Sequence, residues 1–231
     1  MSKDVMLITG DSKGIGRYLV EYYISKGFHV IGCSRGNSLS TDSYQHFCAD
    51  VSDEDSVKKM FKIIRQQHGH VDVLINNAGV ASMNHSLLTT IATVRNILNT
   101  NVVGTFLFCR EAAKLMRGVS NGRIVNFSTA AVPLKLDGEA VYAASKAAVV
   151  SLTQILAKEL SSMGITVNAV GPTPIKTDLI KSVSSSKIEK LLNMQTIHRY
   201  GEFVDVVNVI DFFLRPESNF ITGQVIYLGG V

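Results

Sequence analysis

The chain has no tryptophan, only four prolines and no long uninterrupted apolar run. It also lacks a Gly-, Ser- or Pro-rich linker, so we expect residues 1–231 to form a single domain. No stretch approaches the roughly 18 apolar residues that a membrane span needs, and the N-terminal apolar run is too short for a signal peptide. These absences argue against a membrane partner and against export.

Cysteines and basic clusters are too few to support two further classes of site. Cys33, Cys48 and Cys109 are odd in number and lack metal-ligand spacing, which predicts no metal site and reduced thiols in a cytoplasmic protein. The formal net charge is +4, but Lys and Arg form no basic run, so the pattern favours no nucleic-acid partner. On charge alone, an ordinary solvated surface is the simpler explanation, ahead of a bound anionic cofactor.

Short β-branched segments alternate with segments of helical period. We predict strands at 5–9, 28–33, 46–50, 71–79, 122–128, 165–170 and 223–228. Helices are expected at 15–26, 53–67 and 140–162, and two further helical patterns flank Asn101. Strands that are apolar nearly throughout predict an α/β fold, a parallel sheet covered by helices on both faces. Residues 176–200 interrupt this alternation of strands and helices. Two interpretations fit them: a mobile lid over a site, or an ordinary pair of surface helices.

A glycine-rich loop joins the first strand to the first helix. Gly10, Gly14 and Gly16 allow a tight turn and a close approach to a pyrophosphate, next to the free N–H groups of a helix N-terminus. Ser12, Lys13 and Ile15 belong to the same loop. The spacing differs from the standard dinucleotide-binding pattern, and on its own it also fits any tight turn between a strand and a helix.

The end of the second strand lacks the acidic residue that would bind a ribose 2′-hydroxyl. The strand ends in Cys33, Ser34 and Arg35 instead, and Lys13 lies in the glycine loop. A hydroxyl, a guanidinium and an ammonium suit an adenosine 2′-phosphate, so this pattern favours NADP(H) over NAD(H). The alternative is that both cations are simply solvated.

Seven segments occur in an order that resembles the short-chain dehydrogenase/reductase family, in its short single-domain branch. They are the glycine loop, NNAG (76–79), NTNVVGTF (99–106), GRIVNFST (122–129), YAASK (142–146), NAVGPTPIKTDL (168–179) and ITGQVIYLGG (221–230). The chain is similar to the 3-oxoacyl carrier-protein reductases of this family along essentially its whole length. The resemblance implies a Rossmann-type, doubly wound sheet of seven strands and hydride transfer between a nicotinamide and a carbonyl or alcohol carbon.

The resemblance also assigns roles to individual residues. Asn101 would hold a proton-relay water, Tyr142 would donate a proton to the substrate oxygen, and Lys146 would bind the ribose hydroxyls. The other cofactor-contacting positions implied are Asp50 and Val51 beside the adenine, Asn77, Ala78 and Gly79 along the dinucleotide, and Pro172, Thr173, Ile175 and Thr177 beside the nicotinamide. Family members usually associate through the helices around 102–118 and 142–160, so we expect a homodimer or homotetramer.

Tyr142 and Lys146 are four residues apart and share one face of a helix. A nearby cation favours ionisation of a phenol, so we expect Lys146 to lower the pKa of Tyr142. The family's catalytic serine lies thirteen residues before the tyrosine, where this chain has Thr129. Thr129 is the preferred candidate to bind the substrate oxygen, although a β-bulge would present Ser128 instead.

Two functional hypotheses remain open from the sequence. The first is an NADP(H)-dependent oxidoreductase that acts on a small-molecule carbonyl or secondary alcohol. The second is a non-catalytic NADP(H)-binding regulatory or scaffold protein with the same fold. The presence of Asn101, Tyr142 and Lys146 favours the first, and threonine in place of serine keeps the second open.

Overall fold

Seven strands form one parallel sheet in the computed structural model, which describes residues 4–118, 121–180, 183 and 185–231. The strands are β1 (Val5–Thr9), β2 (His29–Ser34), β3 (Tyr44–Cys48), β4 (Val73–Asn76), β5 (Gly122–Phe127), β6 (Ile165–Gly171) and β7 (Val225–Tyr227). Their order is β3-β2-β1-β4-β5-β6-β7, which confirms the predicted Rossmann-type sheet. The order reverses between β1 and β4, and ligands of open α/β sheets bind beyond the carboxyl ends of strands at such a point.

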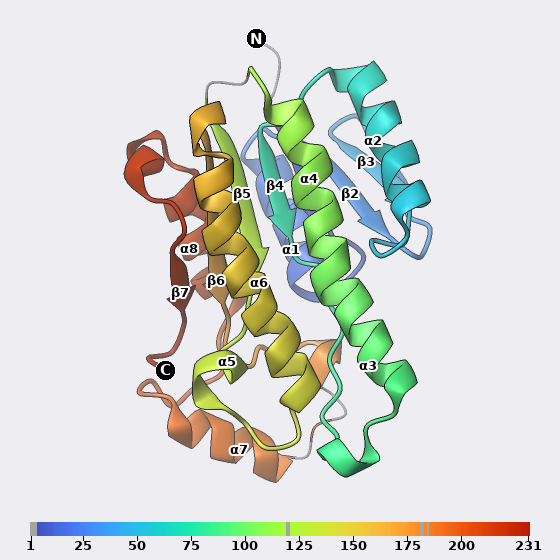
Figure 1. Ribbon diagram of the computed structural model, residues 1–231. Coiled ribbons are helices and arrows are strands. Elements are labelled where there is room, and N and C mark those ends of the chain that lie inside the picture. The colour runs from blue at the N-terminus through green and yellow to red at the C-terminus, as the bar shows by residue number, and fades with distance from the viewer. Residues whose placement is uncertain (1–3, 119–120, 181–182, 184) are drawn as a thin grey trace.

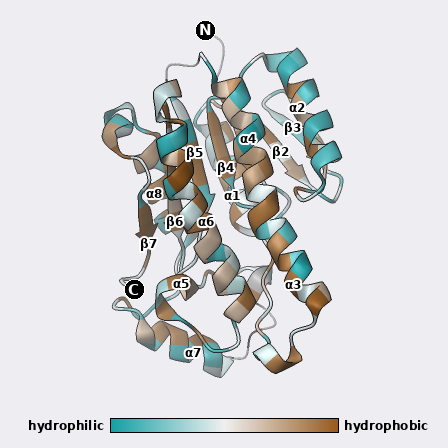
Figure 2. Cartoon of the chain, viewed as in Figure 1, coloured by the Kyte–Doolittle hydropathy of each residue, from teal (hydrophilic) through white to brown (hydrophobic). Residues whose placement is uncertain are grey.

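Helices cover both faces of the sheet (Figure 1). One face carries α2 (Glu54–His68), α4 (Thr105–Met116) and α6 (Ala140–Glu159), and the other carries α1 (Gly14–Ser25) and α8 (Phe203–Leu214). Neighbouring residues of one strand serve different faces: Leu7 packs into the first core and Ile8 into the second. Both faces must therefore be apolar, which is why the strands are hydrophobic throughout while the outer side of α2 is hydrophilic (Figure 2).

Two strands end earlier than the sequence predicts, and local hydrogen bonds explain both ends. β3 covers 44–48 rather than 46–50, because Asp50 Oδ1 accepts hydrogen bonds from Ser52 N (2.9 Å) and Ser52 Oγ (2.7 Å) and so closes a turn. β4 ends at Asn76 because Asn77 turns its side chain to β1, where Nδ2 donates to the carbonyl oxygen of Thr9 (3.0 Å).

The two helical patterns around Asn101 are joined by a π-helical turn. α3 (Ile91–Leu98) leads into this turn, which covers Asn99–Gly104, and α4 follows directly. Gly104 allows the turn to lie against the chain after β3, since a Cβ at this position would lie 2.9 Å from Val51 Cγ2. The wider π-helical turn places the Asn101 side chain in the protein interior.

By length and composition alone, α6 is apolar enough to cross a membrane. In the fold it packs against β5 and β6, and its buried residues include Tyr142, Lys146 and Val149. The hydrophobicity of α6 is therefore explained by its place in the core.

The described part of residues 176–200 contains one short 3₁₀ turn (Asp178–Ile180) and one α-helix, α7 (Ser185–Met194). Residues 181, 182 and 184 of the predicted lid lie outside the described part of the chain. α7 and α5 (Ala131–Leu134) lie beyond the carboxyl ends of the strands (Figure 1), and Ile188 of α7 is buried. The segment thus covers the edge of the sheet where the strand order predicts a ligand site.

Candidate active site

The glycine loop packs tightly because two of its glycines have no room for a side chain. Gly10 has a φ of 72°, and a Cβ there would lie 2.9 Å from Ala78 Cα. A Cβ at Gly16 would lie 2.1 Å from the Gly10 carbonyl oxygen. The loop backbone and the N-terminus of α1 therefore form a concave surface that suits a pyrophosphate.

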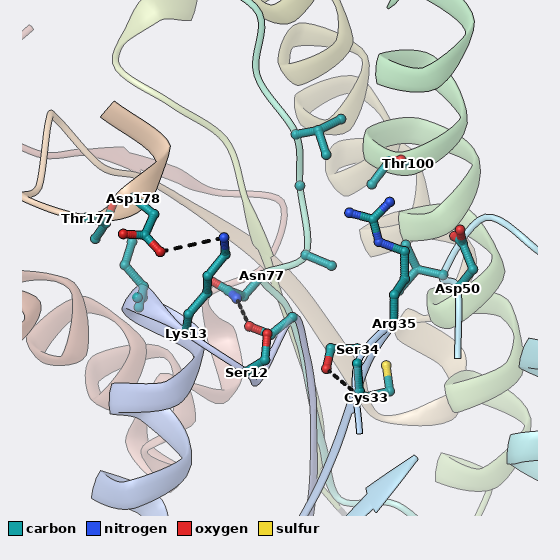
Figure 3. A pocket seen from close by; sticks show the side chains of 18 of the residues that line it. Ser12, Lys13, Cys33, Ser34, Arg35, Asp50, Asn77, Thr100, Thr177 and Asp178 are labelled. Carbon is teal, nitrogen blue, oxygen red and sulfur yellow. Dashed lines mark hydrogen bonds and ion pairs between the residues drawn. The ribbon is translucent and has the colours of Figure 1, made fainter. Parts of the chain in front are cut away.

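A cavity of about 540 Å³ extends from this loop over the ends of β1, β2 and β4 (Figure 3). It brings together most residues that the sequence assigned to cofactor binding: Gly10, Ser12, Lys13, Gly14, Ile15, Ser34, Arg35, Asp50, Val51, Asn77, Ala78, Gly79 and Thr177. Gly16 does not line the cavity, but it lies directly against the Gly10 carbonyl oxygen and so supports the loop. The size of the cavity is within the usual range for a cofactor site.

The two cations predicted to share a phosphate lie apart. Figure 3 shows Arg35 on the side of Ser34 and Asp50, whereas Lys13 lies across Asn77 from them. Lys13 Nζ is 3.6 Å from Asp178 Oδ2, at the start of the segment that covers the site. This differs from our expectation that both cations face one 2′-phosphate, and it leaves Arg35 and Ser34 as the pair at the β2 end.

A buried side-chain cluster behind Arg35 was missed by the sequence reasoning. Asp11 is fully buried, and its Oδ2 lies 2.6 Å from Tyr44 Oη and 2.7 Å from His46 Nδ1. His46 Nε2 lies 2.8 Å from the carbonyl oxygen of Gly36, the residue after Arg35. The cluster thus ties the glycine loop to the backbone that carries Arg35, and Asp11 inside a glycine loop was the signal that could have pointed to it.

The three thiols differ in exposure. Cys33 and Cys109 are buried, and burial raises the pKa of Cys109 to about 12 and that of Cys33 as well. Cys48 is exposed, and its Sγ lies 3.2 Å from the carbonyl oxygen of Arg35. Among the described residues, no group of three or more His, Cys, Asp or Glu side chains is arranged to hold a metal ion.

A second cavity, of about 140 Å³, adjoins the first and is lined by three of the four predicted catalytic residues, Thr129, Tyr142 and Lys146, but not by Asn101. Its lining includes Ser128, Thr129, Tyr142, Lys146, Pro172, Thr173, Ile175 and Thr177. Ile15, Asn77, Gly79 and Thr177 line both cavities. The two spaces together therefore suit an elongated ligand that lies with one end at Arg35 and the other at Tyr142.

Thr129, not Ser128, is the hydroxyl that meets Tyr142. The Thr129 side chain hydrogen-bonds to the Tyr142 phenol and also accepts a hydrogen bond from Ala131 N (3.3 Å). Ser128 continues the strand pairing, with its N donating to Val170 O (2.8 Å), and its buried hydroxyl has no partner among the described residues. The alternation of side chains along the strand explains why the two neighbours differ.

The pKa of Tyr142 departs from our expectation. Burial raises it to about 12, the hydrogen bond from Thr129 lowers it, and the charge of Glu139 raises it further. Lys146 does not oppose this rise in the pKa of Tyr142. Its Nζ donates to the carbonyl oxygen of Phe127 (2.8 Å), and burial lowers its own pKa to about 8. The phenol is therefore a protonated, buried donor at neutral pH.

Asn101 uses its side chain within the protein. Val80 N donates to Oδ1 (2.9 Å), and Nδ2 donates to the carbonyl oxygen of Val80 (2.9 Å) and to Ser145 Oγ (3.0 Å). Both amide hydrogens are thus used within the protein, and the side chain fixes the segment after β4 against α6. The role of Asn101 as the holder of a relay water stays a prediction.

The segment after β6 accommodates Thr173 without a left-handed backbone. Among the described non-glycine residues, Lys135 alone has a positive φ. The Thr173 side chain packs against Gly229: a Cβ at position 229 would lie 2.8 Å from Thr173 Cγ2, which is too close. Gly229 therefore makes room for the Thr173 side chain.

Glu139 is a second buried residue that the sequence reasoning did not single out. It precedes α6, is 5% exposed, and lines the catalytic cavity. Its Oε2 has no hydrogen-bond partner among the described residues. Burial raises its pKa to about 7, and the charge of Lys187 lowers it. An unpartnered buried carboxyl next to Tyr142 costs stability whenever it is ionised.

The Glu139→Gln variant is expected to be more stable than the wild type at pH 8 but nearly equal to it at pH 5. The folded-state pKa of about 7 exceeds the ordinary 4.5, so the stability from protonated Glu139 is lost as the pH rises through about 7. The difference in pKa corresponds to about 3 kcal/mol in the free energy of unfolding at pH 8. Urea unfolding at both pH values measures it, with Glu159→Gln, at the exposed end of α6, as the control. An equal effect of Glu139→Gln at both pH values would contradict the assignment.

Comparison with known proteins agrees with this geometry. A family model described as short chain dehydrogenase matches residues 4–188. The 3-oxoacyl-[acyl-carrier-protein] reductase FabG of Staphylococcus aureus (strain Mu50 / ATCC 700699) is 33% identical over 236 residues, which cover 97% of this chain and 96% of the relative.

Solved structures give the same result. ElxO with NADP bound has a TM-score of 0.89 and 32% identity, covering 98% of this chain and 97% of that one. A tyrosine-to-phenylalanine variant of ElxO with NADPH bound has a TM-score of 0.88 and 31% identity over the same shares of the two chains. 4-Hydroxyisoleucine dehydrogenase complexed with NADH has a TM-score of 0.87 and 26% identity, covering 99% and 98%. The chain belongs to the short chain dehydrogenase family, a family of oxidoreductases.

Proposed function

We propose that the protein is an NADP(H)-dependent oxidoreductase that transfers a hydride between the nicotinamide and a carbonyl or secondary alcohol carbon. The observation that carries this proposal is the pair of adjoining cavities, with Arg35 at one end and the Thr129–Tyr142 pair at the other. ElxO holds NADP in its structure, and 4-hydroxyisoleucine dehydrogenase holds NADH. Arg35 and the lack of a carboxylate at the end of β2 favour NADP(H) here.

The residues present fit such a cofactor. The glycine loop and the N-terminus of α1 would bind the pyrophosphate, and Ser34 and Arg35 the 2′-phosphate. The remaining contacts would come from Asp50 and Val51 at the adenine, Asn77, Ala78 and Gly79 along the chain, Lys146 at the ribose, and Pro172, Thr173, Ile175 and Thr177 at the nicotinamide. When bound, the nicotinamide supplies or accepts the hydride.

The chain's own residues provide binding and proton transfer. Thr129 and Tyr142 hold the substrate oxygen, and Tyr142 donates its phenolic proton to this oxygen during reduction. Lys146, while protonated, lowers the cost of the phenolate that remains. Asn101 acts as a positioning residue, since it holds Val80 in the cavity wall. Burial of Tyr142 excludes water and strengthens its hydrogen bond to the substrate oxygen.

The test is NADPH oxidation by the purified protein with a panel of 3-oxoacyl thioesters, ketosugars, steroids and small diketones, with NADH run in parallel. Turnover of one class, faster with NADPH, is the expected result. Tight NADPH binding without turnover would favour the non-catalytic regulatory or scaffold alternative. Failure to bind either dinucleotide would overturn both hypotheses.

Replacing Thr129 by valine is expected to lower kcat/KM by about 10–100-fold, because valine keeps the shape of threonine but removes the hydrogen bond to the substrate oxygen. The matched variant Ser128→Ala should change kcat/KM by less than about threefold. Steady-state kinetics of the two variants under identical conditions measures the difference. The reverse order of effects would assign the role to Ser128.

We also propose that the chain is a single catalytic domain, cytoplasmic, and a homodimer or homotetramer. Strands from both halves of the chain share one sheet, and the three described cysteines are free thiols. Apolar side chains on the outer sides of α4 and α6 are exposed, among them Phe106 (40%) and Ile155 (50%). Both side chains lie on the helices through which the resemblance implies association, so a homodimer or homotetramer of this kind would bury them.

The Phe106→Asp and Ile155→Asp variants are therefore expected to dissociate into monomers at concentrations where the wild type is assembled. Light scattering after size-exclusion chromatography measures the masses. Leu39→Asp, which alters an exposed leucine in the loop after β2, serves as the control. A monomeric wild type would refute this assembly.

A further inference from the structure

Glu139 lies where the catalytic cavity opens into a third cavity, which α7 covers. This third cavity has a volume of about 290 Å³. The residues that line both spaces are Met83, Glu139, Pro174, Ile180 and Leu191. Glu139 is the polar member of this otherwise apolar wall. A substrate that extends from Tyr142 into the third cavity therefore passes its carboxyl group.

No hydrogen bond to the described part of the protein explains why the Glu139 carboxyl group is buried. The start of α6 receives no hydrogen bond from this side chain, although the Glu139 carbonyl oxygen accepts one from Ala143 N (2.7 Å). Its Oε2 is buried and without a partner among the described residues. Buried polar groups are nearly always hydrogen-bonded, and a ligand in the cavity that donates to Glu139 would account for this exception.

The charges around the cavity indicate which donor Glu139 would bind. The ionisable groups that line the two cavities besides Glu139 are Tyr142 and Lys146 of α6, Lys187 and Lys190 of α7, and Lys135 and Asp137 of the preceding loop. Cations outnumber anions, so a positively charged substrate group would be repelled. A neutral hydroxyl can donate to the carboxyl group without this cost.

The spacing sets how far this hydroxyl lies from the reacting carbon. Glu139 and Tyr142 are three residues apart at the start of a helix, where such side chains are neighbours at roughly 5–6 Å between Cβ atoms. A substrate whose carbonyl oxygen contacts Tyr142 would thus place a hydroxyl on the first or second carbon beyond the carbonyl next to Glu139.

We propose that Glu139 accepts a hydrogen bond from a substrate hydroxyl, and that the natural substrates are hydroxylated ketones without a cationic group, or the matching polyols. This inference rests on the proposed oxidoreductase function. It makes Glu139 a specificity-determining residue of the same site, and it predicts poor use of carbonyl compounds that carry an alkyl group in place of the hydroxyl.

The experiment uses pairs of substrates that differ by a hydroxyl in place of a methyl group: hydroxyacetone against butanone, and 4-hydroxy-2-butanone against 2-pentanone. The measured quantity is the ratio of kcat/KM within each pair. For the wild type we expect a ratio above about ten in favour of the hydroxy ketone, since a buried carboxyl left without its donor is costly. Aminoacetone is the cationic comparison and should be the poorer substrate.

Three variants separate the role of Glu139 from a structural effect. Glu139→Leu should lower the ratio by about 10–100-fold, and Glu139→Gln, which keeps a weaker acceptor, should lower it less. Glu159→Gln makes the same chemical change at the other end of α6 and should keep the wild-type ratio. As the pH rises through about 7, the ratio should increase in the wild type and stay flat in Glu139→Gln, because the ionised carboxylate is the stronger acceptor.

The outcomes distinguish this inference from the proposed function. Turnover of both members of each pair with equal kcat/KM overturns the role of Glu139 and leaves the oxidoreductase function standing. Absence of turnover with every carbonyl compound contradicts the proposed function. In that case, the affinity of each ketone for the NADPH-loaded protein, measured from the change in NADPH fluorescence, still decides the inference. Equal affinity for the hydroxy and alkyl ketones overturns it. A preference for the hydroxy ketones that is lost in Glu139→Leu supports it.

Discussion

Replacement of Tyr142 by phenylalanine is expected to lower kcat by roughly 10²–10⁴-fold while changing the NADPH dissociation constant by less than about threefold. The ring stays in place, so the packing of α6 against the sheet is kept, and the loss is confined to one oxygen atom. That oxygen is the proton donor, and its pKa of about 12 keeps it protonated at every pH at which the assay is run. Steady-state kinetics and a fluorescence titration with NADPH measure the two quantities.

The matched control for this substitution is Tyr18→Phe. Tyr18 lies on α1 and stacks on Phe203 (4.9 Å between ring centroids), so the variant loses a phenolic oxygen away from the catalytic cavity. Its kcat should remain within about twofold of the wild type. If Tyr142→Phe retained wild-type kcat, another group would have to deliver the proton, and the assignment of Tyr142 would be wrong.

The Arg35→Ala variant is expected to weaken NADPH binding by about 10–100-fold and NADH binding by less than about threefold. The 2′-phosphate distinguishes the two dinucleotides, and a charge-assisted hydrogen bond to this group accounts for an effect of this size. Isothermal titration calorimetry with both dinucleotides at low ionic strength gives the two dissociation constants.

Arg215→Ala controls for the loss of one positive charge, since Arg215 is an exposed arginine at the end of α8. The additional variant Lys13→Ala tests the separation of the two cations. Because Lys13 pairs with Asp178 across Asn77 from Arg35, its loss should affect NADPH and NADH alike. Equal losses of both dinucleotides in Arg35→Ala would contradict the assignment of the 2′-phosphate to Arg35.

The elements of the fold could be predicted because their signals are local. Each strand is a short apolar run, and the alternation of strands and helices predicts a parallel sheet covered on both faces. The doubly wound strand order was implied by the resemblance to the short-chain dehydrogenase/reductase family. The Tyr142–Lys146 spacing already places both side chains on one helix face. Thr129 could be chosen over Ser128 because it lies thirteen residues before Tyr142, as the family's serine does, and because neighbouring side chains of a strand alternate, so that both cannot reach Tyr142. The structure has Thr129 next to Tyr142.

The features that were missed depend on burial and on partners distant in sequence. Nothing near Tyr142 in the sequence shows that burial raises the pKa of the phenol. Lys13 pairs with Asp178, and Asp11 of the glycine loop pairs with His46 of β3; both partners are distant in the sequence. Glu139 reads as an ordinary helix-start residue until the fold covers it with α7 and the 3₁₀ turn before it. These pKa shifts and ion pairs depend on which side chains the folded helices and sheet bring together.

The unequal exposure of the three thiols provides a labelling site that needs no engineering. A maleimide dye reacts with an accessible thiolate, so the native protein should be modified at Cys48 well before Cys33 or Cys109. The dye would then be attached at the edge of the dinucleotide cavity, next to the backbone of Arg35. Its emission would report arrival of the adenosine end of the cofactor, separately from the nicotinamide absorbance that follows turnover.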